Sequence, residues 1–129
     1  MNKVIRDGKR RGIGIYFEVK EISFHESLLT IMPQLRTPGG EICPNNPFWL
    51  SLIRDRVDEL CRAVPDFEGL IISIGTRESK VSISTGGCGC EVCRNTEKAQ
   101  WYYEVIKAFY EPLAQYGKNL VIPLSFFSI

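Results

Sequence analysis

Three cysteines in one short stretch are the sharpest chemical signal in the sequence. In Cys88-Gly-Cys90-Glu-Val-Cys93 the thiols are spaced so that all three can face one soft metal ion, and the glycines allow a tight wrap. A tetrahedral structural zinc site needs four ligands. The fourth would be Cys43, His25, a carboxylate or a group outside the chain. The alternative interpretation is a cysteine-rich turn that holds its loop as free thiols or through one disulfide.

A carboxylate that follows an apolar stretch is the second signal. Glu78, preceded by Arg77, comes just after residues 69–75, whose sequence GLIISIG predicts a strand covered on both faces. A carboxylate just past a parallel strand lies at the mouth of a site. In an apolar, closed pocket its pKa would rise, so that it could serve as a general acid. The alternative is a solvated charged turn.

Acidic side chains and the single histidine follow the first predicted strand. They are Glu18, Glu21, His25 and Glu26. Glycosidases need two carboxyl groups, and Glu21 and His25 are the candidates to supply a second carboxylate or to bind a sugar. The alternative interpretation of His25 is an ordinary surface or hydrogen-bonding residue.

Strands alternate with amphipathic helices, which indicates βαβ units and a parallel sheet. Asn46-Pro47 is a favourable helix start, and Gly117 is a favourable helix end. Trp49 and Trp101 lie on apolar helix faces, so we expect them in the core. We expect a helix end at 2–10, strands at 13–19, 69–75 and 119–127, and helices from 47 to about 64 and from about 95 to before Gly117.

Two loops are much longer than the usual connections. The strand-to-helix links, 20–46 and 76–94, far exceed the usual 2–6 residues, whereas the helix-to-strand links are short. In parallel α/β folds the strand-to-helix loops lie at the edge where the strands end, and binding sites form there. We therefore expect the functional site at these two loops.

Composition and charge narrow the class of protein. The chain has 129 residues, with 16 Lys+Arg against 15 Asp+Glu, which gives no general electrostatic reason to expect nucleic acid or a membrane as partner. No run is apolar enough to span a membrane, and no signal peptide is evident. Five cysteines cannot all pair within one chain. These features favour a reducing compartment, and we expect a cytoplasmic protein.

Four features together resemble the catalytic barrels of α-glucuronidase-like and hexosaminidase-like glycoside hydrolases. They are Gly12-Ile-Gly-Ile-Tyr-Phe-Glu, then Ile42-Cys-Pro-Asn-Asn-Pro before a helix, then Pro65-Asp-Phe-Glu-Gly-Leu-Ile-Ile-Ser-Ile-Gly-Thr-Arg-Glu78, and the Cys-x-Cys-x-x-Cys loop. The resemblance covers residues 3–122 and corresponds to the middle of a barrel, about three of its eight strands.

The resemblance implies a partial (β/α)8 TIM barrel with about three parallel strands and two complete helices, residues 1–129 forming one incomplete segment. It implies hydrolysis of O-glycosidic bonds in a polysaccharide or oligosaccharide, with Glu78 as general acid and with no cofactor in catalysis. Glu21, His25 and Arg77 would bind the substrate. Hexosaminidases carry an Asp-Glu pair where this chain has Arg77-Glu78, and the second carboxylate has no counterpart. The remaining barrel strands or a second chain would be needed for activity.

Two other functions fit the same residues. One is a non-catalytic carbohydrate-binding protein that keeps the barrel segment. The other is a small zinc-stabilised α/β interaction module, in which Cys88, Cys90 and Cys93 hold a structural zinc ion.

Overall fold

The chain is a mixed α/β structure in a computed structural model that describes residues 1–74, 79–83 and 87–123. This confirms the predicted α/β class. The described residues form α1 (Asn2–Arg10), β1 (Tyr16–Lys20), α2 (Ser27–Ile31), the 3-10 helix η1 (Pro33–Leu35), α3 (Pro47–Ala63), β2 (Gly69–Ser73), α4 (Glu91–Asn95), α5 (Lys98–Gln115) and β3 (Asn119–Val121).

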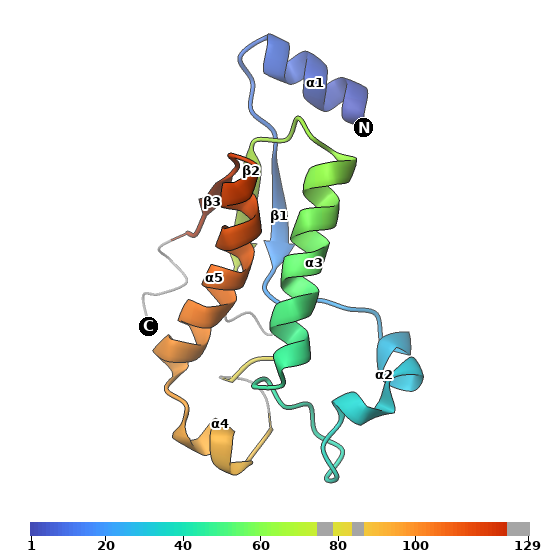
Figure 1. Ribbon diagram of the computed structural model, residues 1–129, viewed down its shortest axis with the longest axis vertical. Coiled ribbons are helices and arrows are strands. Elements are labelled where there is room, and N and C mark those ends of the chain that lie inside the picture. Colours follow the sequence, from blue (N-terminus) through green and yellow to red (C-terminus); the bar gives the residue numbers. More distant parts are fainter. Residues whose placement is uncertain (75–78, 84–86, 124–129) are drawn as a thin grey trace.

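The three strands form one parallel sheet in the order β1-β2-β3. Tyr16 pairs with Gly69, which pairs in turn with Asn119. The chain crosses from β1 to β2 through α3 and from β2 to β3 through α5, and both helices lie on the same face of the sheet (Figure 1). Parallel crossovers are nearly always right-handed, which places successive helices on one face when the strands are in sequential order.

The core lies between this face of the sheet and the two long helices. On α3 the apolar positions recur every four residues, and on α5 every three or four, so each helix buries one face. The buried residues of α3 are Trp49, Ile53, Val57 and Cys61, and those of α5 include Trp101, Val105, Phe109 and Leu113. Both tryptophans are therefore core residues, as their positions predict.

The predicted helix and strand ends are largely confirmed. α3 begins at Pro47, where the Asn46 side chain accepts a hydrogen bond from the Phe48 backbone N–H at 3.0 Å. Gly117 follows α5 with a φ of 67°, a conformation that favours glycine. The first strand begins at Tyr16 rather than at residue 13, because residues 13–15 precede the register with β2. Residues 124–127 of the third predicted strand lie outside the described residues.

The two long loops contain short helices that the sequence does not predict. α2 and η1 lie within 20–46, and α4 begins within 76–94 and ends one residue beyond it, at Asn95. Figure 1 shows α2 and α4 at the end of the molecule where the strands finish, the carboxyl edge of the sheet. α1 lies at the opposite end, the amino edge. In the part of the chain that the structure describes, helices fall short of the length and apolarity needed to cross a bilayer.

Candidate metal centre

Four cysteine side chains from the two long loops meet at the carboxyl edge of the sheet. The sulfur atoms of Cys43, Cys88, Cys90 and Cys93 all lie within 4.8 Å of one another. Cys43 Sγ is 3.6 Å from Cys93 Sγ and 3.9 Å from Cys90 Sγ. A disulfide requires about 2.05 Å, so neither of these pairs is bonded. The four thiols form a group that could hold one metal ion, and Cys43 is the fourth member that the sequence left open.

Helix α4 positions two of the four sulfurs. Cys90 is its N-cap residue, and Cys90 Sγ accepts a hydrogen bond from the backbone N–H of Cys93 at 3.4 Å. A cap of this kind satisfies one N–H of the first turn, the role that serine or aspartate usually has. The thiol at position 90 thus shapes the helix that carries Cys93. The same hydrogen bond lowers the pKa of Cys90 to about 7, because it stabilises the thiolate.

The loop that carries Cys43 is fixed by two buried indoles. Trp49 Nε1 donates to the carbonyl oxygen of Cys43 at 3.2 Å, and Trp101 Nε1 donates to that of Pro44 at 3.1 Å. These tryptophans come from α3 and α5, so each core helix orients one of two adjacent carbonyl groups in this loop. The two carbonyl oxygens are the hydrogen-bond acceptors that the N–H groups of buried indoles require.

Asn45 links the loop that carries Cys43 to the segment that carries Cys93. Its Nδ2 donates to Cys93 Sγ and to Thr96 Oγ1, each at 3.3 Å. An N–H that points at a sulfur ligand stabilises negative charge there and fixes the orientation of the side chain. The segment Cys43-Pro44-Asn45-Asn46 therefore supplies a thiol, a hydrogen bond to a thiol and the start of α3.

Partial burial of Cys43 disfavours the charged form of its thiol. Desolvation raises the pKa of Cys43 to about 12, and hydrogen bonds with the other thiols act in the same direction. The surroundings of Cys43 therefore favour its protonated form. A bound divalent ion reverses this preference, because a coordinating thiol loses its proton. Cys61, the fifth cysteine, is buried within α3 and is not part of the cluster.

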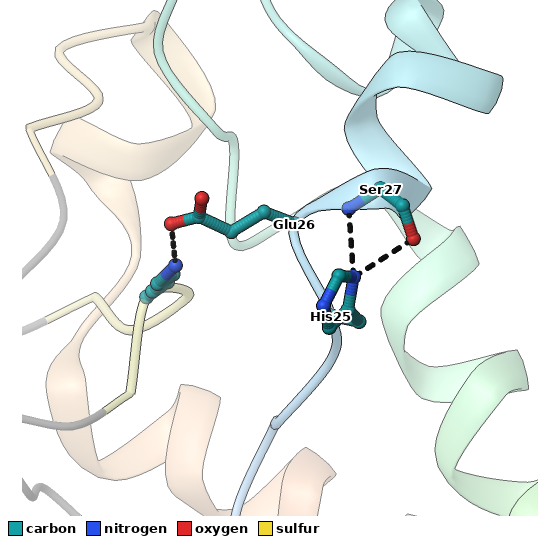
Figure 2. Close-up of polar contacts among 4 residues, drawn as sticks. His25, Glu26 and Ser27 are labelled. Atoms are coloured by element: carbon teal, nitrogen blue, oxygen red, sulfur yellow. Dashed lines mark hydrogen bonds and ion pairs between the residues drawn. The ribbon is translucent and has the colours of Figure 1, made fainter.

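A second contact joins the same two loops. Lys80 Nζ donates to Glu26 Oε1, and this ion pair lowers the pKa of the Glu26 carboxyl group. Beside it, His25 Nδ1 accepts from the Ser27 backbone N–H at 3.2 Å and lies 2.9 Å from Ser27 Oγ. Figure 2 shows Glu26 pointing away from the His25–Ser27 pair. The two long loops thus lie together at the carboxyl edge, as predicted, but His25 caps a local turn and is not among the clustered thiols.

Glu21 follows β1 and is 1% exposed. It lines a cavity of about 100 Å³ between β1 and α3, whose walls are mostly apolar and which also contacts Arg56. The sequence proposes Glu21 as a substrate-binding residue, and that role stays a prediction. Glu78 and Arg77 lie outside the described residues, so the structure does not bring them into relation with Glu21 or His25.

Comparisons with protein-family models, with curated proteins and with solved structures find no match. The resemblance to glycoside hydrolases therefore stays a prediction. What the structure adds is the fourth thiol. The sequence signal that could have identified it is Cys43 itself, three residues before the helix start at Asn46, because a residue so close to a well-defined helix end has a fixed position.

Proposed function

We propose that this chain is a zinc-binding α/β unit in which Cys43, Cys88, Cys90 and Cys93 hold a structural Zn²⁺ that fastens the two long loops together. The observation that carries the proposal is the spacing of the sulfurs. A tetrahedral ion with Zn–S bonds of about 2.3 Å has sulfurs about 3.8 Å apart. Two of the sulfur pairs here, Cys43–Cys93 and Cys43–Cys90, are 3.6 and 3.9 Å apart.

The ligand set favours zinc among the metals that proteins bind. Four thiolates around one centre are typical of Zn²⁺ or of iron–sulfur sites. All four sulfurs lie within 4.8 Å of one another, which suits a single ion better than a cluster whose ligands lie on separate iron atoms. Four protein ligands also leave no open position, which favours a structural role over a catalytic one.

The metal would stabilise the part of the chain with the least secondary structure. Cys43 comes from the first loop, and the other three ligands come from the second. A site absent from the unfolded chain contributes its binding free energy to folding. Zinc would therefore order both loops against the ends of α3 and α5.

The test is metal content together with thiol replacement. Protein purified without chelator is expected to carry one zinc per chain, measured by elemental analysis. Cys43→Ser should lose the metal, because it removes one of four ligands. The matched control is Cys61→Ala, which removes the thiol of the core cysteine outside the cluster and should keep the metal. Wild-type protein that takes up no zinc, or a Cys43→Ser variant that keeps it with unchanged affinity, would contradict the proposal.

A second candidate function is carbohydrate hydrolysis or binding as part of a (β/α)8 barrel. The observation that favours it is the sequential β1-β2-β3 order with both crossover helices on one face (Figure 1), which is also the repeating arrangement of such a barrel. In this proposal Glu78 is the general acid, Glu21, His25 and Arg77 contact the sugar, and the zinc centre holds the second loop in place.

Glu78→Gln separates an enzyme from a carbohydrate-binding protein. In the intact protein an enzyme should lose turnover of aryl glycosides by at least about a hundredfold and keep its affinity for the sugar. A binding protein should show no turnover in either form. The hydrolase proposal is wrong if turnover exists and survives the substitution unchanged.

A further inference from the structure

The near-neutral net charge conceals a strong separation of charge along the chain. Residues 1–12 hold five of the sixteen basic residues and one of the fifteen acidic residues. The segment therefore has a net charge of +4, and the remaining residues, with eleven basic and fourteen acidic side chains, have a net charge of −3. A segregation of this kind points to an anionic partner even when the total charge does not.

Helix α1 presents the positive charge on one side. Lys3, Arg6 and Arg10 are separated by three and four positions, so they lie on one face of the helix, here called the basic face, which Asp7 borders at four positions from Lys3 and three from Arg10. All three side chains are exposed. Within residues 1–74, 79–83 and 87–123, no ion pair involves any of them.

The opposite side of α1 attaches the helix to the body of the protein. Ile5 is 3% exposed and belongs to the core. Asn2 Nδ2 donates to the carbonyl oxygen of Ala63 at 3.1 Å, and Lys9 Nζ is 3.9 Å from Asp66 Oδ1. These contacts fix α1 at the amino edge of the sheet, beside the C-terminal end of α3 (Figure 1). The basic face is thus a positioned surface and not part of a free tail.

We infer that the basic face binds the phosphate backbone of nucleic acid without sequence preference. Lys3 and Arg10 are seven residues apart, or about 10 Å along the helix axis. This length corresponds to three phosphate-to-phosphate steps of about 3.4 Å rise along one strand of a duplex. Phosphate contacts of this type give affinity and position and carry no sequence information.

The same helix is poorly suited to a membrane. An interfacial helix needs a continuous apolar face of large residues that enters the acyl region. On α1 the only large apolar side chains are Val4, which is 68% exposed, and Ile5, which is already buried in the core. The net charge of the chain predicts no nucleic-acid partner, whereas the position of the basic residues on α1 favours one.

The test is binding of zinc-loaded protein to a fluorescein-labelled 20-base-pair DNA duplex, measured by anisotropy across salt concentrations. Three phosphate contacts give a slope of about −2.7 in log K against log salt, or a loss of affinity of about 40-fold between 50 and 200 mM. Neutralising the basic face with Lys3→Gln, Arg6→Gln and Arg10→Gln together should lower affinity at 50 mM salt at least tenfold and flatten the slope.

The matched control carries Arg54→Gln, Arg62→Gln and Lys107→Gln on α3 and α5, which change the net charge equally. Each of these residues is in a surface ion pair with a half-exposed carboxylate, Glu111 or Asp58, so the loss to stability is small. Circular dichroism of both triple variants serves as the control for folding. The inference is overturned if the two variants weaken binding equally, if wild type does not bind the duplex, or if wild type binds phosphatidylserine vesicles and not DNA.

Discussion

The two edges of the sheet are held together by different physical means. At the amino edge short links join the helices to the strands, and the chain is fixed by close packing. At the carboxyl edge two long loops meet, and they are joined through thiols and a surface ion pair. Packing sets the shape of the first edge, whereas in the proposal made above the second edge is held by a bound ion. The comparison shows where the four clustered cysteines lie, which is the edge with the longer loops and without the short helix-to-strand links.

Removing the metal should have the largest effect on stability among the changes described here. A chelator that strips zinc should lower the melting temperature by about 10 °C or more, because structural zinc contributes several kcal/mol to folding. Circular dichroism with and without chelator measures the shift. Adding zinc back should restore the melt, and an identical melt in both conditions would mean that the carboxyl edge does not depend on a metal.

Gly69→Ala should disrupt the amino edge by packing alone. A Cβ at residue 69 would collide with the Asn119 carbonyl oxygen and lie 2.9 Å from the Tyr16 ring. The Tyr16 hydroxyl accepts a hydrogen bond from Asn119 Nδ2 at 3.2 Å, which holds this ring beside Gly69. We expect a loss of about 2–3 kcal/mol in the free energy of unfolding, measured by urea denaturation.

The control for this substitution is Gly8→Ala in α1, because a Cβ there makes only ordinary contacts, the nearest at 3.4 Å. Gly69→Ala should keep one zinc per chain, since its position is at the other end of the sheet. A variant that unfolds at lower urea and also loses zinc would show that the two edges are coupled.

Trp101→Phe should weaken the metal centre without removing a ligand. Phenylalanine keeps most of the ring contacts but cannot donate to the Pro44 carbonyl oxygen, so the loop that carries Cys43 loses one of its two indole hydrogen bonds. Zinc affinity, measured by competition with a chromogenic chelator, should fall about tenfold. Tyr103→Phe on the exposed side of α5 is the control and should bind zinc normally. Equal affinities in the two variants would exclude a role for the indole.

Glu26→Gln should have the smallest effect, and it should depend on pH. Lys80 lowers the pKa of the Glu26 carboxyl group in the folded state, so the pair stabilises the fold above the ordinary carboxyl value of 4.5 and this contribution is lost as pH falls below it. Melting temperatures of wild type and variant should differ slightly at pH 7 and converge at pH 3. A difference that grows in acid would contradict this assignment.

More of the fold than of the candidate site could be predicted from the sequence. Asn46-Pro47, the apolar faces of α3 and α5 and the apolar strand at 69–73 are local signals, and local signals specify local structure. α2 and α4 were missed because each has five residues, too few to show a period. α4 in addition begins at a cysteine, which is not a usual N-cap residue.

Three of the four cysteines in the candidate metal centre could be grouped from the sequence alone. Cys88, Cys90 and Cys93 are close in sequence, so their spacing reveals them. Cys43 is about 50 residues away from Cys93, and only the parallel sheet brings the two loops to one edge. The basic face was missed for a different reason, because summing charges over the whole chain removes the information about where they lie.

X-ray absorption at the zinc edge tests the central claim most directly. Protein loaded with one equivalent of zinc should show four sulfur neighbours at about 2.3 Å and no lighter atom in the coordination sphere. A nitrogen or oxygen ligand, or fewer than four sulfurs, would contradict a centre formed by Cys43, Cys88, Cys90 and Cys93.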